Sequence, residues 1–267
     1  IGHDRTTIAV STGRYCEFTR VLDWGGWSLN VAIARELDRS PSEVEAFLSG
    51  LDDERLSIAE AGAITFTTHL VSRSARLKAF ARHPFFTGVC ADLVGPDVNL
   101  YWDQAVYKKP EKPRRFPWHQ DNGYAFVEPQ QYLTCWVALT DATAGNGCPQ
   151  VARGLHRAGT LAHTYVEPLG WECLTDPDDV AVAHVGAGGV VVFSSLTPHL
   201  TGPNLTDAVR KAYILQYAPQ GATVLRGAPA VAPTGRTAAE DPARQFPVMR
   251  HGEPRALSLT TNKGGHH

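Results

Sequence analysis

The sequence lacks several features that mark specialised classes of protein. Its 27 acidic and 25 basic side chains leave a formal net charge of only −2, which predicts no basic surface for nucleic acid or for an anionic membrane. No apolar run approaches the ~18 residues of a membrane-spanning helix, and no internal repeat, G-x-G-x-x-G, P-loop or H-E-x-x-H motif occurs. These absences predict a globular protein that binds neither nucleic acid nor a membrane.

The cysteines also exclude two kinds of site. They are odd in number and include no C-x-x-C pair, which argues against a disulfide framework and against a structural zinc ribbon. We expect a reduced, cytoplasmic protein in which most of them are small core side chains. The sequence leaves the oligomeric state open. The five cysteines are Cys16, Cys90, Cys135, Cys148 and Cys173.

Glycine and proline are frequent, with 24 and 18 among 267 residues, and this favours a turn-rich fold over a helical bundle. Only the early part of the chain has helical patterns. Ser40–Glu43 forms a capping box, Leu56–Phe80 carries apolar residues at three- and four-residue spacing, and Pro84–Leu93 predicts a short helix. We therefore expect helical support over residues 24–95.

From Val98 onward, apolar residues alternate or form short runs bounded by turn residues, a pattern typical of strands. No long helical stretch separates these strands, which indicates an antiparallel sandwich or barrel rather than a parallel doubly wound sheet. Beyond Pro219 there is little periodicity, and we expect a C-terminal tail over residues 220–267. The predicted strands are Val98–Tyr107, Leu133–Thr140, Val180–His184, Gly189–Phe193 and Ala212–Tyr217.

Three polar side chains have the chemistry of a metal site. In an extended segment, residues i and i+2 share a face, so His119 and Asp121 can converge on one point. His199 stands just past the apolar strand that ends near Phe193. Taken singly, each histidine is better explained as an ordinary turn, capping or core residue. Together, the three would form the two-histidine, one-carboxylate triad of non-haem Fe(II) oxygenases.

An arginine marks the start of the last predicted strand. Arg210 precedes the apolar run Ala212–Tyr217, and its planar, permanently charged guanidinium could bind a dicarboxylate through two parallel hydrogen bonds. The alternative is a strand-end arginine that faces water.

In order and spacing, these signals resemble the phytanoyl-CoA dioxygenase (PhyH-like) family of Fe(II)/2-oxoglutarate-dependent oxygenases. The resemblance covers roughly residues 98–219, and the arginine eleven residues after His199 has the spacing of that family. The family usually has Pro-Gly-Ser-His near the position of His156, so the contacts of that loop are not carried over. The landmarks are Gln104–Lys108, Trp118–Asp121, Cys135–Leu139, Asn146–Cys148, Arg153–His156 and Gly202–Asn204.

The resemblance implies a mostly β fold with flanking helices, built as a double-stranded β-helix (a jelly-roll or cupin-like barrel). It implies one oxygenase domain over residues 1–267, with the barrel at residues 98–219. It also implies that Fe(II) is the metal, and that 2-oxoglutarate and O2 are co-substrates. The implied iron ligands are His119, Asp121 and His199.

The same resemblance assigns side chains to 2-oxoglutarate. Arg210 would anchor the far carboxylate, and Thr201 would hydrogen-bond the same group. Gln104 and Trp136 lie on predicted strands whose inward faces would meet the co-substrate. For both, a structural role is the alternative, as a strand residue facing water or as plain core.

The substrate is expected to be a small molecule that enters over the mouth of the barrel. A basic run precedes the first metal-ligand pair, and it fits either a solvated loop or an attraction for an anionic substrate. Its members are Lys108, Lys109, Lys112, Arg114 and Arg115. The candidate substrate-lining residues are Tyr107, Trp118, Asn122, Tyr124, Phe126 and Gln150.

The predicted reaction is hydroxylation of an unactivated C–H bond, coupled to decarboxylation of 2-oxoglutarate to succinate and CO2, with secondary metabolism as the expected setting. Halogenating relatives replace the carboxylate ligand by a small residue, so Asp121 favours hydroxylation. Desaturation, epoxidation and ring closure would use the same metal ligands. Two further alternatives are a metal-free binding module and a zinc or manganese hydrolase or isomerase on a cupin-like barrel, which has no need of Arg210.

Overall fold

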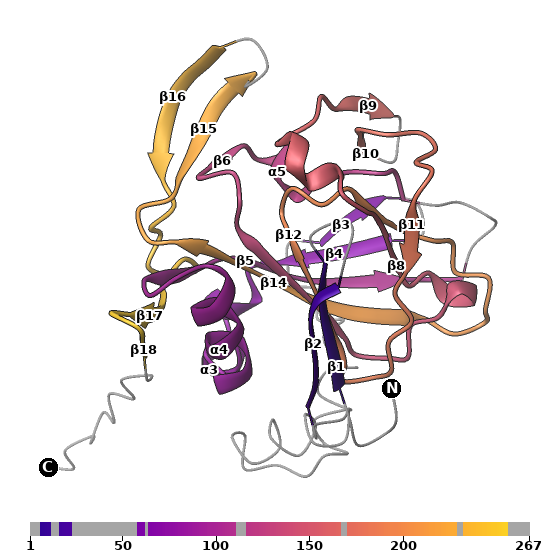
Figure 1. Cartoon of the computed structure of the whole chain (residues 1–267), viewed down its shortest axis with the longest axis horizontal. Coiled ribbons are helices and arrows are strands. Elements are labelled where there is room, and N and C mark those ends of the chain that lie inside the picture. The colour runs from indigo at the N-terminus through magenta and orange to yellow at the C-terminus, as the bar shows by residue number, and fades with distance from the viewer. Residues whose placement is uncertain are drawn as a thin grey trace, which may run out of the picture.

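A computed structural model describes residues 6–11, 16–22, 58–61, 64–110, 116–166, 170–228 and 232–255, with the backbone alone for the first three ranges. Figure 1 shows a strand-rich molecule with two curved antiparallel sheets and two helices packed against one side. The predicted jelly-roll class, mostly β with flanking helices, is confirmed.

The main sheet carries most of the fold. Its strand order is β12-β7-β14-β5-β17-β18, and all neighbours are antiparallel. The second half of β5 pairs with β4, which in turn pairs with β3. The strands are β12 (Val190–Ser194), β7 (Leu133–Ala138), β14 (Arg210–Pro219), β5 (Val98–Lys108), β17 (Pro247–Arg250), β18 (Glu253–Pro254), β4 (Ile64–Thr68) and β3 (Ile58–Ala61).

The second sheet has the order β11-β8-β13, and Trp118–His119 extends it through an isolated bridge to His199. Its strands are β11 (Val180–Val182), β8 (Pro149–Ala152) and β13 (His199–Thr201). The remaining strands form small pairs and a three-stranded sheet, namely β1 (Thr6–Ser11) with β2 (Cys16–Leu22), β9 (Thr164–Val166) with β10 (Gly170–Glu172), and β6 (Val127–Glu128) with β15 (Thr223–Ala228) and β16 (Ala232–Ala238).

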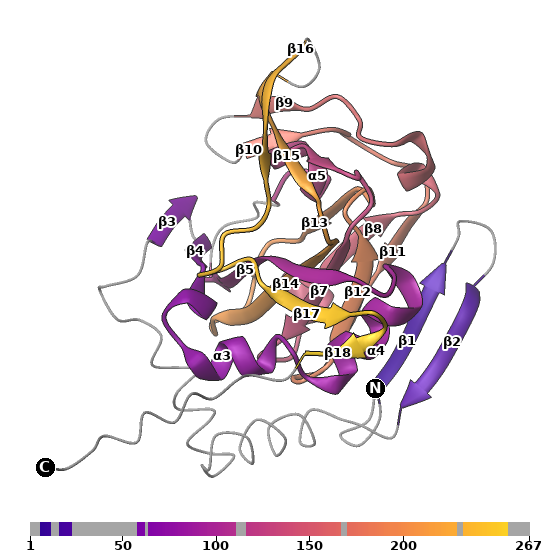
Figure 2. The same cartoon turned by 90° about the vertical axis from the view of Figure 1, so that its left-hand side faces the viewer.

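The helices are short and sit at defined places. In Figures 1 and 2, α3 and α4 lie on one side of the main sheet, whereas α5 lies on the other side, beside β9 and β10. Within the part of the chain that the structure describes, no helix is long and apolar enough to cross a membrane. The helical segments are η1 (Leu70–Ser72), α3 (Ala75–Phe80), α4 (Pro84–Leu93), α5 (Asp121–Tyr124), η2 (Ala144–Asn146) and η3 (Leu155–Ala158).

Both faces of the main sheet are buried, which explains why its strands are apolar runs with little alternation. One face packs against α3 and α4 and joins Tyr213 and Leu215 to Phe86 and Cys90. The register Ala212↔Val106 and Ala212↔Ala138 places the alternate residues of β5, β14 and β7 on the other face. This interior face, which carries Trp136, Ile214 and Phe193, looks into the barrel and carries the site described below.

The helix predicted over Leu56–Phe80 is partly wrong. This stretch contains β3 and β4, and its α-helix begins only at Ala75. Ile64–Thr68 is rich in β-branched residues and pairs with the edge of β5, so strand pairing prevails over an apolar spacing that also fits a helix. The helix at Pro84–Leu93 is confirmed as α4. Residues 24–57, with the capping box Ser40–Glu43, lie outside the described residues.

The C-terminal tail expected over residues 220–267 is also corrected, because its described part contains strands. β17 pairs with β5 through Pro247↔Asn99, and Val248 and Met249 are buried. A four-residue strand shows little periodicity by itself, and its burial is decided by the sheet edge that it covers. Among the predicted core cysteines, burial is confirmed for Cys90, Cys135 and Cys148, and Cys173 is half-buried.

A carboxyl group is buried on the helix-facing side of β5. The Oδ2 atom of Asp103 accepts hydrogen bonds from the Tyr213 hydroxyl at 2.8 Å and from the Val71 N–H at 3.2 Å. Burial outweighs these contacts and raises the pKa of Asp103 to about 6. The folded chain therefore binds this proton more tightly than the unfolded chain, so protonation stabilises the fold as the pH falls through the folded-state value.

We expect the wild-type chain to gain stability relative to Asp103→Asn as the pH falls from about 8 to about 5, because the variant has no carboxyl to protonate. The gain should be about 1 to 1.5 kcal/mol, measured by urea unfolding at each pH. The exposed Asp176 supplies the control, Asp176→Asn, which should follow the wild-type chain. A stability difference between wild type and Asp103→Asn that stays constant with pH would contradict this account.

Candidate metal centre

The two histidines of the predicted triad face each other across neighbouring strands. His119 N–H donates to the His199 carbonyl at 2.9 Å, and His199 N–H donates to the His119 carbonyl at 2.8 Å. Two residues that exchange both backbone bonds in an antiparallel pair have side chains on the same face. Their imidazole rings accordingly lie 4.2 Å apart between centroids. This one cross-strand bridge joins two residues that are 80 positions apart in the sequence.

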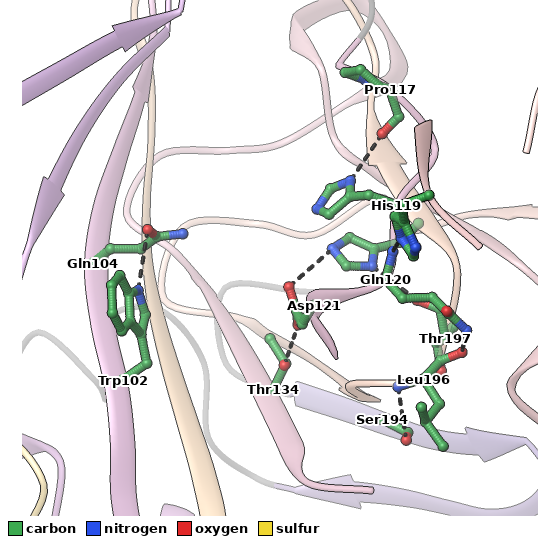
Figure 3. A network of polar contacts seen from close by, with 12 residues as sticks. Trp102, Gln104, Pro117, His119, Gln120, Asp121, Thr134, Ser194, Leu196 and Thr197 are labelled. Carbon is green, nitrogen blue, oxygen red and sulfur yellow. Dashed lines mark hydrogen bonds and ion pairs between the residues drawn. The ribbon is translucent and has the colours of Figure 1, made fainter. Parts of the chain in front are cut away.

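The carboxylate of Asp121 is the third member of the candidate metal-ligand set. Asp121 is the first residue of α5, after Gln120 in an extended conformation, so the predicted extended segment holds as far as Gln120 and then turns into a helix. The Asp121 Oδ1 atom lies 3.7 Å from His199 Nε2. One donor atom from each of His119, Asp121 and His199 lies within 4.8 Å of the other two. Figure 3 shows His119 and Asp121 turned toward the same space.

Backbone carbonyls set the orientation of both imidazoles. His119 Nδ1 lies 2.9 Å from the Pro117 carbonyl, and His199 Nδ1 lies 2.9 Å from the Thr197 carbonyl. A carbonyl oxygen only accepts, so each Nδ1 carries the hydrogen and each Nε2 keeps its lone pair. Burial lowers the pKa of His119 to about 3 and that of His199 to about 4. Neutral imidazoles with a free Nε2 are the form that binds a metal.

The aspartate is held by two polar side chains of the main sheet. The Thr134 hydroxyl donates to Asp121 Oδ2, and Gln216 also hydrogen-bonds the carboxyl group. Burial raises the pKa of Asp121, whereas His119 and these hydrogen bonds favour the carboxylate. Two neutral imidazoles and one carboxylate that face one common position fit a divalent iron ion bound there. Because the three donors lie on one side of that position, the other coordination positions of the ion would stay open.

The guanidinium of Arg210 is the second polar group of interest on the interior face. The side chain of Arg210 is almost fully buried, at 1% exposure, and its Nε and both Nη atoms have no hydrogen-bond partner among the described residues. The guanidinium lies 5.1 Å from the ring centroid of Trp136, and burial lowers the pKa of Arg210 to about 10. Burying an unpaired cation is costly, so this guanidinium fits a bound anion.

The register of β5 and β14 reveals a residue that the sequence interpretation placed elsewhere. Lys108 pairs with Arg210 and is fully buried, whereas it was counted in a basic loop. Its Nζ lies 3.4 Å from the Thr201 carbonyl, on the strand of His199. Alternation puts Thr201 on the same face as His199. The signal for Lys108 was its place directly after the apolar strand that ends at Tyr107, two residues before Pro110.

The other two residues assigned to 2-oxoglutarate also lie on the interior face. Gln104 and Trp136 both pair with Ile214, from opposite sides of β14. The Gln104 Oε1 atom accepts a hydrogen bond from Trp102 Nε1 at 3.2 Å, and Figure 3 shows the amide pointing toward the space that His119 and Asp121 face. The structure thus brings these side chains to one face of one sheet.

Of the candidate substrate residues, Tyr124 lies closest to the metal ligands. Its ring is 5.3 Å from the His119 ring between centroids, and 45% of the residue is exposed. Asn122 is fully buried, and both ends of its amide bind the protein: Nδ2 donates to Thr160 Oγ1 and Oδ1 accepts from Val127 N–H. Asn122 therefore holds two loops together, since both ends of its amide bind other segments of the protein.

The structure turns three other candidates away from the site. Tyr107 lies on the helix-facing side of β5 and packs in that core. Trp118 precedes His119 in an extended segment, so it points to the opposite face, where it packs with Ala152 and Leu200. Gln150 pairs with Leu200 and shares that outer face. Side chains alternate between the two faces of a strand, and the sequence motif alone does not show which of them face inward. This alternation explains why these three side chains point away from the site.

The last substrate candidate is Phe126, and the basic run is described only in part. Phe126 is half-buried beside β15, where its carbonyl accepts Leu225 N–H at 2.8 Å. Of the basic run, Lys109 is exposed, and the other three members after Lys108 lie outside the described residues.

Gln120, between the two proximal ligands, ties three segments together. Its Nε2 donates to the Gly159 carbonyl at 2.9 Å and to the Leu196 carbonyl at 2.6 Å, and its Oε1 accepts Leu161 N–H at 2.7 Å. His163 Nε2 accepts the Gln120 backbone N–H at 3.0 Å. The loop 159–163 is thereby fastened to the backbone that presents His119 and Asp121.

A jelly-roll barrel with two histidines and one carboxylate on its inner face is the arrangement typical of non-haem Fe(II) oxygenases. The family model described as phytanoyl-CoA dioxygenase (PhyH) matches residues 30–212, and the chain belongs to this family. Iron(II), 2-oxoglutarate and O2 are the cofactor and co-substrates of the family, so the cofactors expected from the sequence are confirmed at that level.

Individual relatives are distant. The chain is 27% identical over 144 residues to a 2-aminoethylphosphonate dioxygenase of uncultured bacterium HF130_AEPn_1, with 53% of each chain covered. It is 30% identical over 134 residues to a methylphosphonate hydroxylase of Gimesia maris, with 47% of each covered. The chain thus spans about half the length of the curated relatives that it matches.

Solved structures share the fold. The carbocyclase SnoK from nogalamycin biosynthesis aligns with a TM-score of 0.61 at 22% identity and covers 82% of this chain and 95% of its own. The epimerase SnoN, solved with Fe3+, alpha-ketoglutarate and nogalamycin RO, aligns with a TM-score of 0.58 at 21% identity and covers 85% and 87%. At this identity the likeness concerns the fold alone.

We expect Gln120→Ala to destabilise the fold by about 2 to 4 kcal/mol, because it leaves two buried carbonyls and one N–H without their partner. Urea unfolding measures the loss. Gln150→Ala, a glutamine of the outer face, serves as control and should cost less than about 1 kcal/mol. Equal losses in the two variants would show that the Gln120 contacts do not hold the segment.

Proposed function

We propose that this chain is an Fe(II)/2-oxoglutarate-dependent oxygenase that hydroxylates an unactivated C–H bond of a small organic molecule. In the same reaction, 2-oxoglutarate would be decarboxylated to succinate and CO2. The observation that carries the proposal is the buried, unpaired guanidinium of Arg210 on the face that also presents the metal-ligand group. A binding module without a co-substrate, or a simple metal hydrolase, has no use for such a cation.

In this proposal, His119 and His199 bind iron through Nε2, and Asp121 binds it through Oδ1. The Pro117 and Thr197 carbonyls hold the imidazoles in that tautomer, and Thr134 holds the other carboxylate oxygen. The metal supplies the oxygen chemistry when bound. The protein contributes a set of donors whose orientation is held by these hydrogen bonds.

The dicarboxylate would lie between the metal ligands and the Arg210–Lys108 pair. Thr201 connects the two places, because it follows His199 by two residues on one face and its carbonyl lies near Lys108 Nζ. Two buried cations opposite a dianion in a medium of low dielectric constant give a strong, charge-assisted contact. Trp136 covers the guanidinium face, and Gln104 offers its amide nearby.

Aromatic side chains would keep water from the reacting centre. The Phe116 ring lies 5.0 Å from His119, and the Phe193 ring lies 4.5 Å from His199, between centroids. Apolar walls around such a site lower the local dielectric constant and would exclude water from the reacting centre. A hydroxyl group would then be delivered only to a C–H bond held beside the metal.

The carboxylate ligand supports hydroxylation over halogenation, and relatives named hydroxylase and dioxygenase support hydroxylation more generally. Desaturation, epoxidation and ring closure share the same first ligands, and fold neighbours named epimerase and carbocyclase show how far one barrel can vary. The small-molecule substrate and the role in secondary metabolism are part of the proposal, supported by neighbours from nogalamycin biosynthesis.

We expect His119→Ala to lose both tight binding of Co(II), used as a spectroscopic substitute for iron, and succinate release. The affinity for Co(II) should fall by more than about 100-fold. Even the loss of a side chain that only orients a metal-ligating residue costs up to about that factor. Absorption titration measures the binding. The exposed His184 gives the control His184→Ala, which should keep both properties. Full turnover by His119→Ala with metal bound would refute the ligand assignment.

We expect Arg210→Met to abolish stabilisation by 2-oxoglutarate without destabilising the free chain. Methionine is apolar and of similar length, and it replaces a buried cation that has no partner among the described residues. The free energy of unfolding of the free chain should therefore rise by about 0 to 2 kcal/mol. Thermal unfolding with and without 2-oxoglutarate measures both effects. Arg153→Met, at a surface ion pair with Asp179, is the control. Undiminished stabilisation of Arg210→Met by 2-oxoglutarate would contradict the co-substrate site.

A further inference from the structure

One buried side chain joins the two sheets beside Arg210. Asn204 lies in the loop 202–209, which leads from β13 in the second sheet to β14 in the main sheet. The residue is fully buried. A buried amide is costly unless its polar atoms are paired, so the partners of Asn204 show which segments it holds together.

All four hydrogen-bonding positions of the Asn204 amide are used. Nδ2 donates to the Lys108 carbonyl at 2.8 Å and to the Ala208 carbonyl at 2.7 Å. Oδ1 accepts the Thr206 N–H at 3.1 Å and the Thr206 hydroxyl at 2.7 Å. The contacts with Thr206 and Ala208 stay within the loop. The contact with Lys108 reaches a residue 96 positions away.

The Lys108 contact ends on the cross-strand partner of Arg210. Lys108 and Arg210 are paired in the register of β5 and β14. The Asn204 amide therefore fastens the loop to the end of the strand pair that carries the guanidinium. The loop itself begins directly after Thr201 on β13, the strand of His199. Asn204 thus ties the metal-ligand strand to the guanidinium strand by a bond other than the chain itself.

The other side of the loop packs against a glycine turn. The Leu205 N–H donates to the Gly145 carbonyl at 2.8 Å. Gly147 has a positive φ of 86°, and a Cβ built on it would collide with the Gly202 carbonyl oxygen. Only glycine permits this close contact. The loop is therefore packed between residues 145–147 and the end of β5.

We propose that Asn204 is a positioning residue that sets the span between the metal ligands and Arg210, and with it the length of the 2-oxo dicarboxylate that the site accepts. A dicarboxylate that binds the metal at one end and the guanidinium at the other must match this span. An added methylene would move the far carboxylate away from the position at which it forms two parallel hydrogen bonds. This inference rests on the proposed function, because it takes 2-oxoglutarate as the ligand of Arg210.

The test is isothermal titration calorimetry of the Co(II)-loaded full chain with three 2-oxo acids. Co(II) takes the place of iron so that no oxidation occurs during the titration. 2-Oxoadipate is one methylene longer than 2-oxoglutarate, and 2-oxopentanoate has the same carbon chain with a methyl group in place of the far carboxylate. The wild-type chain should bind 2-oxoglutarate at least about 10-fold more tightly than 2-oxoadipate, the lower bound for one misplaced methylene.

Two variants remove the bond between Asn204 and Lys108. Asn204→Ala removes every amide contact, whereas the hydroxyl of Asn204→Ser can still accept the Thr206 N–H in a local turn. Both should reduce the preference for 2-oxoglutarate over 2-oxoadipate to less than about 3-fold, because the span is no longer held. The affinity for Co(II) should stay near the wild-type value, since the metal ligands keep their own hydrogen bonds. Asn204→Ser decides the question if Asn204→Ala does not fold.

Two matched controls should keep the wild-type preference. Thr206→Val removes the hydroxyl contacts within the loop and leaves the bond between Asn204 and Lys108 in place. Asn99→Ala removes a buried amide at the other end of β5, where Oδ1 accepts Arg250 Nη2 at 2.6 Å. Thermal unfolding of each variant measures the loss of stability that the controls share with the Asn204 variants.

The possible failures are distinguishable. An unchanged preference in Asn204→Ser, with Co(II) still bound, would show that Asn204 does not set the span. A wild-type chain that binds both dicarboxylates equally, or an equal loss of preference in Asn99→Ala, would also overturn the inference and leave the proposed function standing. Equal binding of 2-oxoglutarate and 2-oxopentanoate by the wild-type chain would show that Arg210 does not bind the far carboxylate. That result would reject the proposed co-substrate site, and the inference with it.

Discussion

The backbone pairing of His119 with His199 is the contact on which the rest of the site depends. Reciprocal N–H to carbonyl bonds fix the register of the two segments, and register decides which face each side chain takes. A slip of one residue on either segment would turn one imidazole to the outer face. The Gln120 amide and the His163 ring add bonds that prevent such a slip. The metal donors are therefore positioned by strand geometry before any ion is bound.

The main sheet serves two purposes because both its faces are buried. Its outer face packs with α3 and α4 in an apolar core that supplies most of the stabilising burial. Its interior face places charges where an apolar residue would be more stable, with Arg210 unpaired and Lys108 beside it. The apolar burial on the outer face offsets the free-energy cost of burying these charges on the interior face. A bound dianion would remove that cost.

Several features could be predicted from residues alone, and others could not. The helix at Pro84–Leu93 was predicted correctly, and the structure brings the three proposed metal donors together, since short motifs and capping signals are local. Lys108, Trp118 and Gln150 were misplaced, because each lies beside a correctly recognised motif but on a face that only pairing determines. The strands at Ile64–Thr68 and Pro247–Arg250 were missed for the same reason: they exist as partners for the edge of β5.

The sequence by itself determined the chemistry: which donor types are present, in which order, and that a barrel of short strands holds them, because these follow from residue identity and local periodicity. Only the tertiary structure decided which of those residues meet. The distance of 4.8 Å that encloses the three donors, the lack of a hydrogen-bond partner for Arg210 among the described residues and the facing rings of His119 and His199 all arise from the way segments far apart in the chain are arranged. Such contacts depend on register and on packing, which no local pattern encodes.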